Sequence, residues 1–270
     1  MPTPSTLPAI HFAALSDPGQ NRTHNEDSLL CSAPLKLWAV ADGMGGHQRG
    51  EVASALALQV LRDQVESGSG LSEAVVEAHE AIRAAAAADL ASQGMGTTLV
   101  AVQLDGDRFT LVWVGDSRAY RISMDRIEAL SSDHSWVQEM VDAGQMSSAE
   151  ARVHPRRNVI TQCLGQAEFP PQPDVLTGQL QPGEILLLCS DGLTGELTDE
   201  QILEYSATAE TLDGLVSQLI RAANQSGGKD NLSCIVLACE MPQPTIVPGR
   251  RGRGLLGYLF PRRKRNGRSA

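Results

Sequence analysis

The residues of this sequence most suited to chemistry are aspartates that adjoin strongly apolar runs. Asp42 closes LWAVAD, Asp116 follows TLVWVG, and Asp191 follows EILLLCS. Asp230 stands on the other side of such a run, at the start of DNLSCIVL. Each aspartate adjoins a glycine or a glycine-rich loop. A single Asp-Gly pair is ordinary turn chemistry, but its repetition indicates carboxylates gathered at one end of a sandwich.

The charge of such a cluster decides its chemistry. Glu26 and Asp27 precede another strand-like stretch and add two carboxylates to the group. Like charges in a partly dry site are costly unless cations neutralise them. Carboxylates and water suit Mg²⁺ or Mn²⁺, no Cys or His accompanies them at zinc spacing, and the adjacent glycines let backbone carbonyls approach a metal. The pattern therefore predicts a binuclear centre of hard cations.

Such a centre suits the hydrolysis of phosphate esters, because two metals activate a bridging water and clamp the attacking and leaving oxygens. Arg22, four residues before Glu26, is the candidate for the phosphoryl group, since its planar guanidinium pairs bidentately with phosphate. No cysteine is followed by Arg six positions later, and GxSxG, HExxH and GxxxxGK[ST] are absent from the sequence. Nucleophilic serine or cysteine catalysis has no support.

The periodicity of apolar residues predicts the elements that position these acids. Helices are expected over residues 47–65 and 71–90, separated by SGSG. TTLVAVQL and DRFTLVWV form a predicted hairpin with Asp105-Gly106 as its two-residue turn, and AYRISM and RIEALS form a further pair. Residues 134–153 carry two short helical patterns broken near Gly144. GEILLLCS, residues 212–223 and NLSCIVLAC predict a strand, a helix and a closing strand. Strands and helices in separate blocks favour an α+β sandwich.

Composition places the chain among soluble globular proteins, and 270 residues suffice for one substantial core. No run approaches the roughly 20 apolar residues of a membrane helix, and no signal peptide is recognised at the start. Five cysteines without a CxxC pair indicate reduced thiols and a cytoplasmic location.

The net charge of −10 conceals two parts of opposite sign. Residues 241–270 hold eight of the 22 Lys and Arg and none of the 32 Asp and Glu, so residues 1–240 carry −18. The acidic body favours cations or basic partners and opposes nucleic acid. Residues 241–270 are predicted to be a Pro/Gly linker and a basic, disordered tail. The alternative is a tail that attaches weakly to an anionic membrane or an acidic partner.

Eight segments in order resemble the type 2C, or PPM, family of metal-dependent protein phosphatases, particularly its bacterial members: RTHNEDS, VADGMGGH, GMGTTLV, VGDSRAYR, SSDHSW, HPRRNVITQCLG, LCSDGL and GGKDNLSCIV. The resemblance covers roughly residues 10–238 and implies a catalytic domain over 1–240. The implied fold is α+β, with a central antiparallel β-sandwich flanked by pairs of helices in four αββα layers. A small flap subdomain over about 133–165 would lie beside the site and suit substrate choice.

The resemblance also implies roles for the acidic residues. Asp42 would bridge two Mn²⁺ or Mg²⁺ ions, the Gly43 carbonyl would bind one of them, and Asp191 and Asp230 would hold the other. Asp116, with Asp191, matches the residues that hold a weaker third metal in bacterial members.

The remaining matches concern water, phosphate and the leaving group. Glu26 and Asp27 match the acidic pair that positions metal-bound waters, and Arg22 matches the phosphate-binding arginine. A water bridging the metals would attack without a phosphoenzyme. Animal members have a histidine, proposed as the general acid, where this chain has Met44; His47 does not match that position and is read as a helix-start residue. A metal-bound water is the alternative proton source.

The expected function is hydrolysis of phosphoserine and phosphothreonine on proteins, opposing a cognate bacterial Ser/Thr kinase. One alternative is the same activity dedicated to a secretion or stress-response partner. The other is a catalytically inactive regulator that binds phosphoproteins, which the intact metal set disfavours because a mere binder does not need it.

Overall fold

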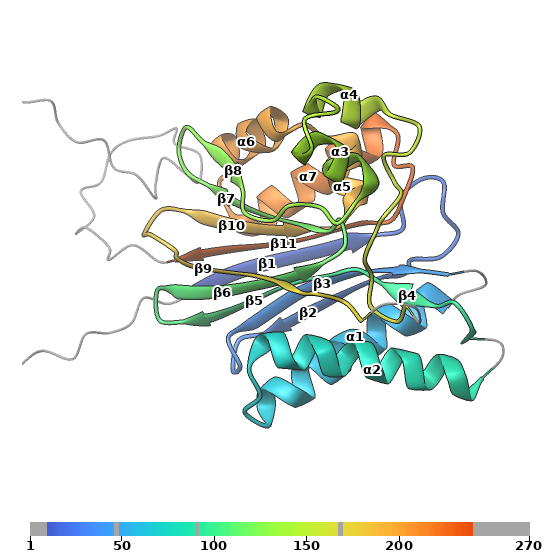
Figure 1. The fold of residues 1–270 in the computed structure, drawn as a ribbon. Helices are drawn as coiled ribbons and strands as arrows, with labels where there is room; N and C mark the ends of the chain where they lie inside the picture. Colours follow the sequence, from blue (N-terminus) through green and yellow to red (C-terminus); the bar gives the residue numbers. More distant parts are fainter. Residues whose placement is uncertain (1–9, 46–48, 90–91, 167–169, 240–270) are drawn as a thin grey trace, which may run out of the picture.

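Two antiparallel sheets lie face to face in this protein, and helices cover the outer face of each (Figure 1). The computed structural model describes residues 10–45, 49–89, 92–166 and 170–239. The first sheet has the strand order β1 (Ile10–Asp17), β11 (Leu232–Cys239), β10 (Ile185–Cys189), β7 (Arg118–Ile122), β8 (Ile127–Ala129). The second has the order β2 (Asp27–Ser32), β3 (Leu37–Met44), β5 (Leu99–Asp105), β6 (Arg108–Val114), β9 (Asp174–Gln179), and the short β4 (Gly96–Thr97) pairs with the end of β3.

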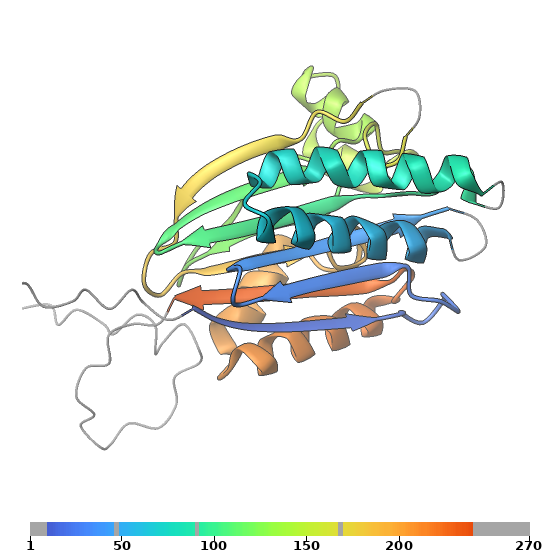
Figure 2. The same cartoon turned by 90° about the horizontal axis from the view of Figure 1, so that it is seen from below.

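The helices complete four layers. One group packs on the first sheet: α5 (Asp191–Glu196), α6 (Asp199–Thr208) and α7 (Leu212–Ser226). The other group packs on the second sheet, as Figure 2 shows from below: α1 (Arg49–Glu66) and α2 (Leu71–Ala88). The predicted αββα sandwich is confirmed.

Three layers of buried side chains hold the four layers of structure together, and alternation along single strands explains them. In β3, Trp38 and Val40 face the other sheet, whereas Leu37, Ala39 and Ala41 face α1 and α2. In β11 all eight residues are buried. The continuous apolar runs of the sequence are therefore strands with both faces covered, which is why they show no polar alternation.

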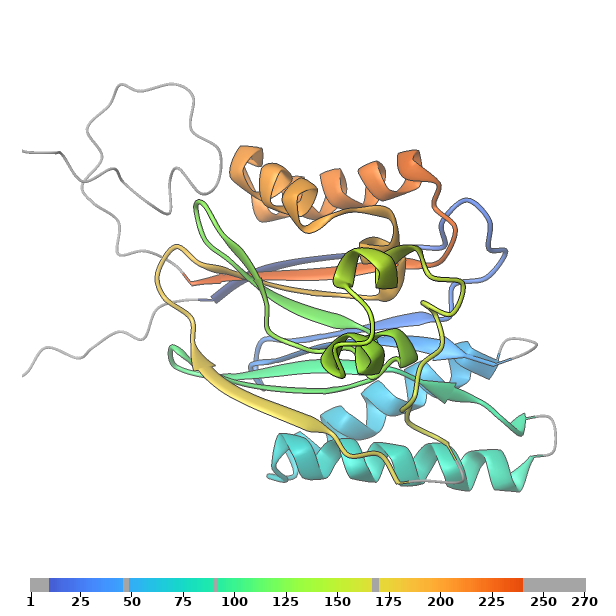
Figure 3. The ribbon, with the colours of Figure 1, turned by 45° about the horizontal axis from the view of Figure 1, so that its top comes forward.

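The predicted flap, residues 133–165, contains two short helices, α3 (Trp136–Asp142) and α4 (Ser148–Val153). The Ser135 and Ser147 hydroxyls cap the helices by accepting hydrogen bonds from the backbone N–H groups of Gln138 and Glu150. The predicted break falls at Gly144, between them. In Figures 2 and 3 these helices lie at the side of the sandwich where the edge strands β8 and β9 run.

Several predicted boundaries differ from the structure. The pair Asp105↔Arg108 still belongs to the ladder, so the hairpin turn consists of Gly106 and Asp107, and the prediction of Asp105-Gly106 was wrong by one residue. The first helix begins at Arg49, after His47, which lies outside the described residues. The second ends at Ala88. The predicted linker and tail, residues 241–270, also lie outside the described residues.

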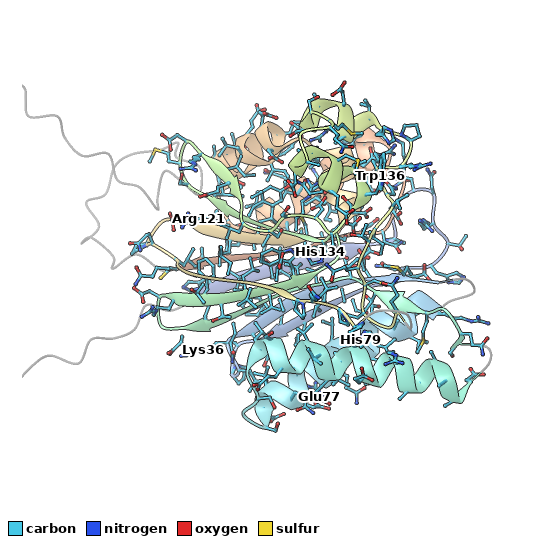
Figure 4. The ribbon with its side chains drawn as sticks, in the orientation of Figure 1. Lys36, Glu77, His79, Arg121, His134 and Trp136 are labelled. Carbon is cyan, nitrogen blue, oxygen red and sulfur yellow. The ribbon has the colours of Figure 1, made fainter. Side chains whose placement is uncertain are left out.

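His79 fastens the end of the flap to α2 (Figure 4). Its side chain is 1 % exposed, and its Nδ1 accepts a hydrogen bond of 3.1 Å from the backbone N–H of Gly165. Gly165 adopts a φ of 90°, and a Cβ there would lie 2.5 Å from Cγ2 of Ile82. The chain leaving the flap is thus pressed against α2, and His79 supplies its acceptor.

We expect His79→Leu to lower the free energy of unfolding by about 1–3 kcal/mol, because it leaves the buried Gly165 N–H without an acceptor. His79→Asn places an amide oxygen near the position of Nδ1 and should cost less than half as much. Urea denaturation of both variants checks this, provided that the unfolding free energy depends on urea concentration with the same slope in each. Equal losses in the two variants would contradict the role given to the hydrogen bond.

Candidate active site and metal centre

Five of the predicted aspartates meet at one end of the sandwich. Asp27 and Asp42 are directly opposite each other in the β2–β3 ladder. Asp42 and Asp191 lie close enough for the carboxyl group of each to affect the pKa of the other. Asp116 and Asp230 lie close enough to Asp42 for their charges to act on it. The structure therefore brings together acids that are more than 200 residues apart in the sequence.

The elements deliver these acids in different ways. Asp42 is not at the end of its strand, because Gly43 and Met44 continue β3 and pair with Thr97 and Gly96. Asp191 is the first residue of α5, one residue after Ser190.

The other two stand beside strands. Asp116 lies in the turn after β6, and Asp230 lies just before β11. Strand ends, a helix start and a strand interior all contribute to one cluster.

Asp27 and Asp116 are buried, Asp42 and Asp191 are half-buried, and lost hydration and mutual repulsion both raise the pKa values of these four acids. Burial, followed by the charges of Asp27, Asp191 and Asp116, places the pKa of Asp42 well above its ordinary value. Burial and the charge of Asp191 do the same to the pKa of Asp116. Burial and the charge of Asp230 raise the pKa of Asp191. Burial raises the pKa of Asp27 to about 7, although hydrogen bonds from serines oppose the shift. A neutralising cation would relieve this cost.

The donor set fits hard divalent cations. Oδ1 of Asp27 is buried and has no hydrogen-bond partner, whereas its Oδ2 accepts a 2.8 Å bond from the Ser190 hydroxyl. In the described part of the chain, no group of three or more His, Cys, Asp or Glu side chains is arranged so that it could hold a metal ion by itself. A bound ion would therefore complete its shell with backbone carbonyls and water, which Mg²⁺ and Mn²⁺ accept readily.

Gly43 is required by packing as well as by any metal. A Cβ at Gly43 would overlap the carbonyl oxygen of Gly50. The N–H of Gly43 donates a 3.2 Å hydrogen bond to the Glu26 carbonyl. The backbone of β3 thus runs against the first turn of α1. The residue pattern alone indicates only the approach of a metal as the reason for this glycine.

Glu26 holds the same junction together. Its Oε1 accepts a 3.2 Å hydrogen bond from the N–H of Gly50, and its carbonyl accepts 2.6 Å from the Ser54 hydroxyl. A carboxylate at a helix N-terminus is favourable because it meets unpaired N–H groups and the positive end of the helix dipole. Glu26 therefore fixes the start of α1 beside Gly43.

Arg22 lies at the exposed edge of the cluster. Its Nη2 donates a 2.8 Å hydrogen bond to Oδ2 of Asp230, and half of its side chain is exposed. The hydrogen bond to Asp230, and the charges of Asp230, Glu26 and Asp42, raise the pKa of Arg22. The positively charged guanidinium of Arg22 thus faces solvent next to the acid cluster.

Asn231 is a positioning residue that sequence reasoning missed. Its side-chain amide donates to the carbonyls of Pro18 and His24, at 3.0 and 2.9 Å, and accepts 2.9 Å from the N–H of Glu26. One buried amide thus fixes both ends of the loop that carries Arg22. The available signal was its place directly after Asp230 in the segment GGKDN.

Two threonine hydroxyls hold the backbone of Asp42 by hydrogen bonds. Thr98 Oγ1 accepts from the Asp42 N–H at 3.2 Å and shares a 2.7 Å hydrogen bond with the Ser117 hydroxyl, next to Asp116. Thr97 Oγ1 donates to the Asp42 carbonyl at 2.9 Å. The segment GMGTTLV signalled these residues only through the family resemblance.

A cavity of about 430 Å³ opens beside the cluster, between the flap and α5. Asp116 and Asp191 form one wall, and Arg118, Asp133, Arg152 and Arg157 are among the residues around it. Arg118 and Asp133 pair through two hydrogen bonds of 2.7 Å. The space adjoins the acids and offers room for more than a phosphoryl group.

In the described residues no helix is long and apolar enough to cross a membrane.

Comparison with known proteins supports this picture. The family model for protein phosphatase 2C matches residues 19–236, which include every residue of the site described above except Pro18. The serine/threonine protein phosphatase PstP of Mycobacterium tuberculosis is 38% identical over 233 residues, 84% of this chain and 44% of that protein. This chain therefore spans less than half the length of that relative.

Other relatives match along nearly their full length. The serine/threonine phosphatase stp of Listeria innocua is 33% identical over 247 residues, 87% of this chain and 98% of that protein. Among solved structures, the catalytic domain of PstP in complex with two manganese ions has a TM-score of 0.77 and 35% identity, covering 86% of this chain and 99% of that one.

The raised pKa values predict how the metal-free protein responds to pH. Asp27 titrates at about 7 in the folded state and at about 4 in the unfolded chain, so the folded state binds the proton more tightly. The free energy of unfolding should therefore fall as pH rises between those values. Thermal melts in chelator should give a lower Tm at pH 8 than at pH 5, and added Mn²⁺ should restore it at pH 8.

Asp116→Asn is the matched variant for this test, since it removes one buried charge at nearly constant size. We expect it to raise the metal-free Tm at pH 8 by about 2–4 °C for each kcal/mol of repulsion relieved. A metal-free Tm that rises from pH 5 to pH 8 would contradict the account of the cluster.

Proposed function

Because this chain belongs to the protein phosphatase 2C family of metal-dependent serine/threonine protein phosphatases, we propose that it hydrolyses phosphoserine and phosphothreonine on proteins. The observation that carries the proposal is the buried cluster of Asp27, Asp42, Asp116 and Asp191 with Arg22 at its edge. A cation–binding cluster and a phosphate-binding arginine are the two parts that phosphate ester hydrolysis requires.

We assign the metal ligands as follows. Asp42 would be a ligand of both ions, the Gly43 carbonyl would bind one of them, and Asp191 and Asp230 would hold the other. When bound, the metal pair supplies an activated water and neutralises charge on the phosphoryl oxygens. Asp116, with Asp191, is proposed to hold a weaker third ion. The choice between Mn²⁺ and Mg²⁺ is proposed to follow supply, since both accept this donor set.

The remaining side chains orient the reactants. Arg22 is placed to bind the phosphoryl group of the substrate from the solvent side, next to Asp230. Glu26 and Asp27 are proposed to order water around the ligand cluster. Met44 pairs with Gly96 at the end of β3, and its thioether has no proton to donate, so the leaving hydroxyl takes its proton from another group. We propose direct hydrolysis without a phosphoenzyme.

The partners follow from the chemistry of the substrate. Phosphoserine and phosphothreonine imply a cognate Ser/Thr kinase, and the acidic body disfavours nucleic acid. A cytoplasmic location is proposed from the cysteines, because Cys31, Cys163, Cys189 and Cys234 carry free thiols. Dedication to a secretion or stress-response partner, and contact of the basic tail with a membrane or an acidic partner, remain further proposals. A catalytically inactive binder is disfavoured, because binding alone would not repay the burial of four repelling acids.

The decisive experiment is hydrolysis of a phosphothreonine peptide with and without Mn²⁺. We expect turnover that chelation abolishes, and a loss of kcat of about a hundredfold or more in Asp42→Asn and in Asp191→Asn. Full activity in excess chelator would overturn the metal mechanism.

Arg22→Lys separates phosphate recognition from metal binding. The lysine keeps the charge beside Asp230 but loses the bidentate fork, so KM for the peptide should rise by about tenfold while the Mn²⁺ concentration for half-maximal activity changes little. A changed Mn²⁺ requirement with unchanged KM would show that Arg22 acts on the metal site instead.

A further inference from the structure

Arg152 links the flap to the helix that carries Asp191. It lies in α4, and its Nη2 donates to the carbonyls of Leu197 and Thr194, at 2.9 and 3.4 Å. These carbonyls lie at the C-terminal end of α5, where helix carbonyls lack partners within the helix and a cation is favourable. Asp191 is the first residue of this same six-residue helix. A displacement of Arg152 therefore acts on an element of the active site.

The outer part of the flap has few other attachments. The base is tied by backbone bridges, Thr97↔Leu164 on one side and the His134 N–H to the Gly115 carbonyl on the other (Figure 4 labels His134). Between them, among the described residues, the hydrogen bonds that join residues 144–158 to the molecule outside the flap are those of Arg152. Arg152 thus holds the outer flap in place.

The flap and α5 are the two sides of the 430 Å³ cavity beside Asp116 and Asp191. Arg118, which pairs with Asp133, and Arg152 both line this cavity. The width of the cavity therefore depends on the Arg152 hydrogen bonds. A small aryl phosphate needs only the acid cluster and Arg22, whereas a phosphoprotein must place its neighbouring residues in space adjoining the cluster.

We propose that Arg152 is a positioning residue that fixes the flap against α5 and thereby sets how well the enzyme binds the peptide part of a substrate. The proposal rests on the proposed phosphatase function. It assigns Arg152 an effect on binding of the peptide and little effect on the reaction at the phosphorus.

The kinetic test compares a phosphothreonine peptide with p-nitrophenyl phosphate in the Mn²⁺-loaded full chain. Arg152→Met keeps the length of the side chain but removes its donors, and we expect KM for the peptide to rise by about tenfold, with kcat/KM for p-nitrophenyl phosphate within about twofold of wild type. Arg152→Lys keeps a single donor and should recover part of the loss.

Arg156→Met is the matched control, since Arg156 lies in the same flap but stacks over the Trp136 ring, at 5.1 Å, without contacting α5. It removes the same charge and should leave the ratio of the two substrates unchanged. A control variant that shifts the ratio as much as Arg152→Met would reduce the effect to charge and overturn the proposal. Equal losses on both substrates in Arg152→Met would also overturn it.

Limited trypsin digestion tests the contact without relying on catalysis. Arg156 and Arg157 are exposed on the flap, and loss of the Arg152 hydrogen bonds should speed cleavage after them by about tenfold at unchanged Tm. Unchanged cleavage would overturn the proposal. If the wild-type chain hydrolysed no phosphopeptide, the phosphatase function would fail, whereas the digestion would still report on the contact.

Discussion

The mutual repulsion of buried aspartates is the constraint on which the rest of this structure depends. Asp27 and Asp116 are buried, Asp42 and Asp191 are half-buried, and lost hydration and neighbouring carboxylates raise the pKa of all four. Such a cluster persists only if the surrounding packing fixes it and cations complete it. The sandwich supplies that packing through three buried layers. The fold thereby keeps the carboxylates close together despite their repulsion, and this repulsion favours the binding of a cation.

Contacts made to the backbone, either by another backbone segment or by a side chain, hold the site in place. Gly43 and Gly50 meet without side chains between them, Glu26 joins β2 to the start of α1, and Asn231 binds three backbone groups of the N-terminal loop. The hydrogen bonds of Glu26 and Asn231 connect segments that are distant in the sequence. Hydrogen bonds to the backbone place the acids with little freedom, which suits ligands of an ion that demands fixed geometry.

The flap is held differently from the sandwich. The sandwich is closed by apolar burial, whereas the outer flap depends on Arg152 and on the half-buried Trp136, which packs against His154 and Arg156 (Figure 4). Polar and ring contacts of this kind are weaker than a packed core, so the outer flap should open at a lower cost in free energy than the sandwich. The proposed catalytic cluster and the proposed recognition surface thus depend on two kinds of interaction.

Strong local patterns allowed much of the fold to be predicted from the sequence, and weak ones explain the omissions. The long helices, the β5–β6 hairpin and the buried runs β3, β10 and β11 have clear periods or continuous apolar character. β1 and β9 were missed because IHFAALSD and DVLTGQ alternate poorly, and their pairing with β11 and β6 is what makes them strands. The α6 helix was missed although Thr198 and Gln201 form a capping box that could have been recognised.

The sequence by itself determined which acids the site contains. Aspartates recur beside apolar runs and glycines, and a shared cation is the simplest single explanation for that recurrence. The sequence also determined the family, since the order of eight motifs is specific. Only the tertiary structure decided that Gly43 serves the contact of β3 with α1, that Glu26 anchors that helix, and that Arg152 ties the flap to α5. These roles depend on contacts between residues remote in the sequence, and local periodicity carries no information about which distant backbone groups a side chain will reach.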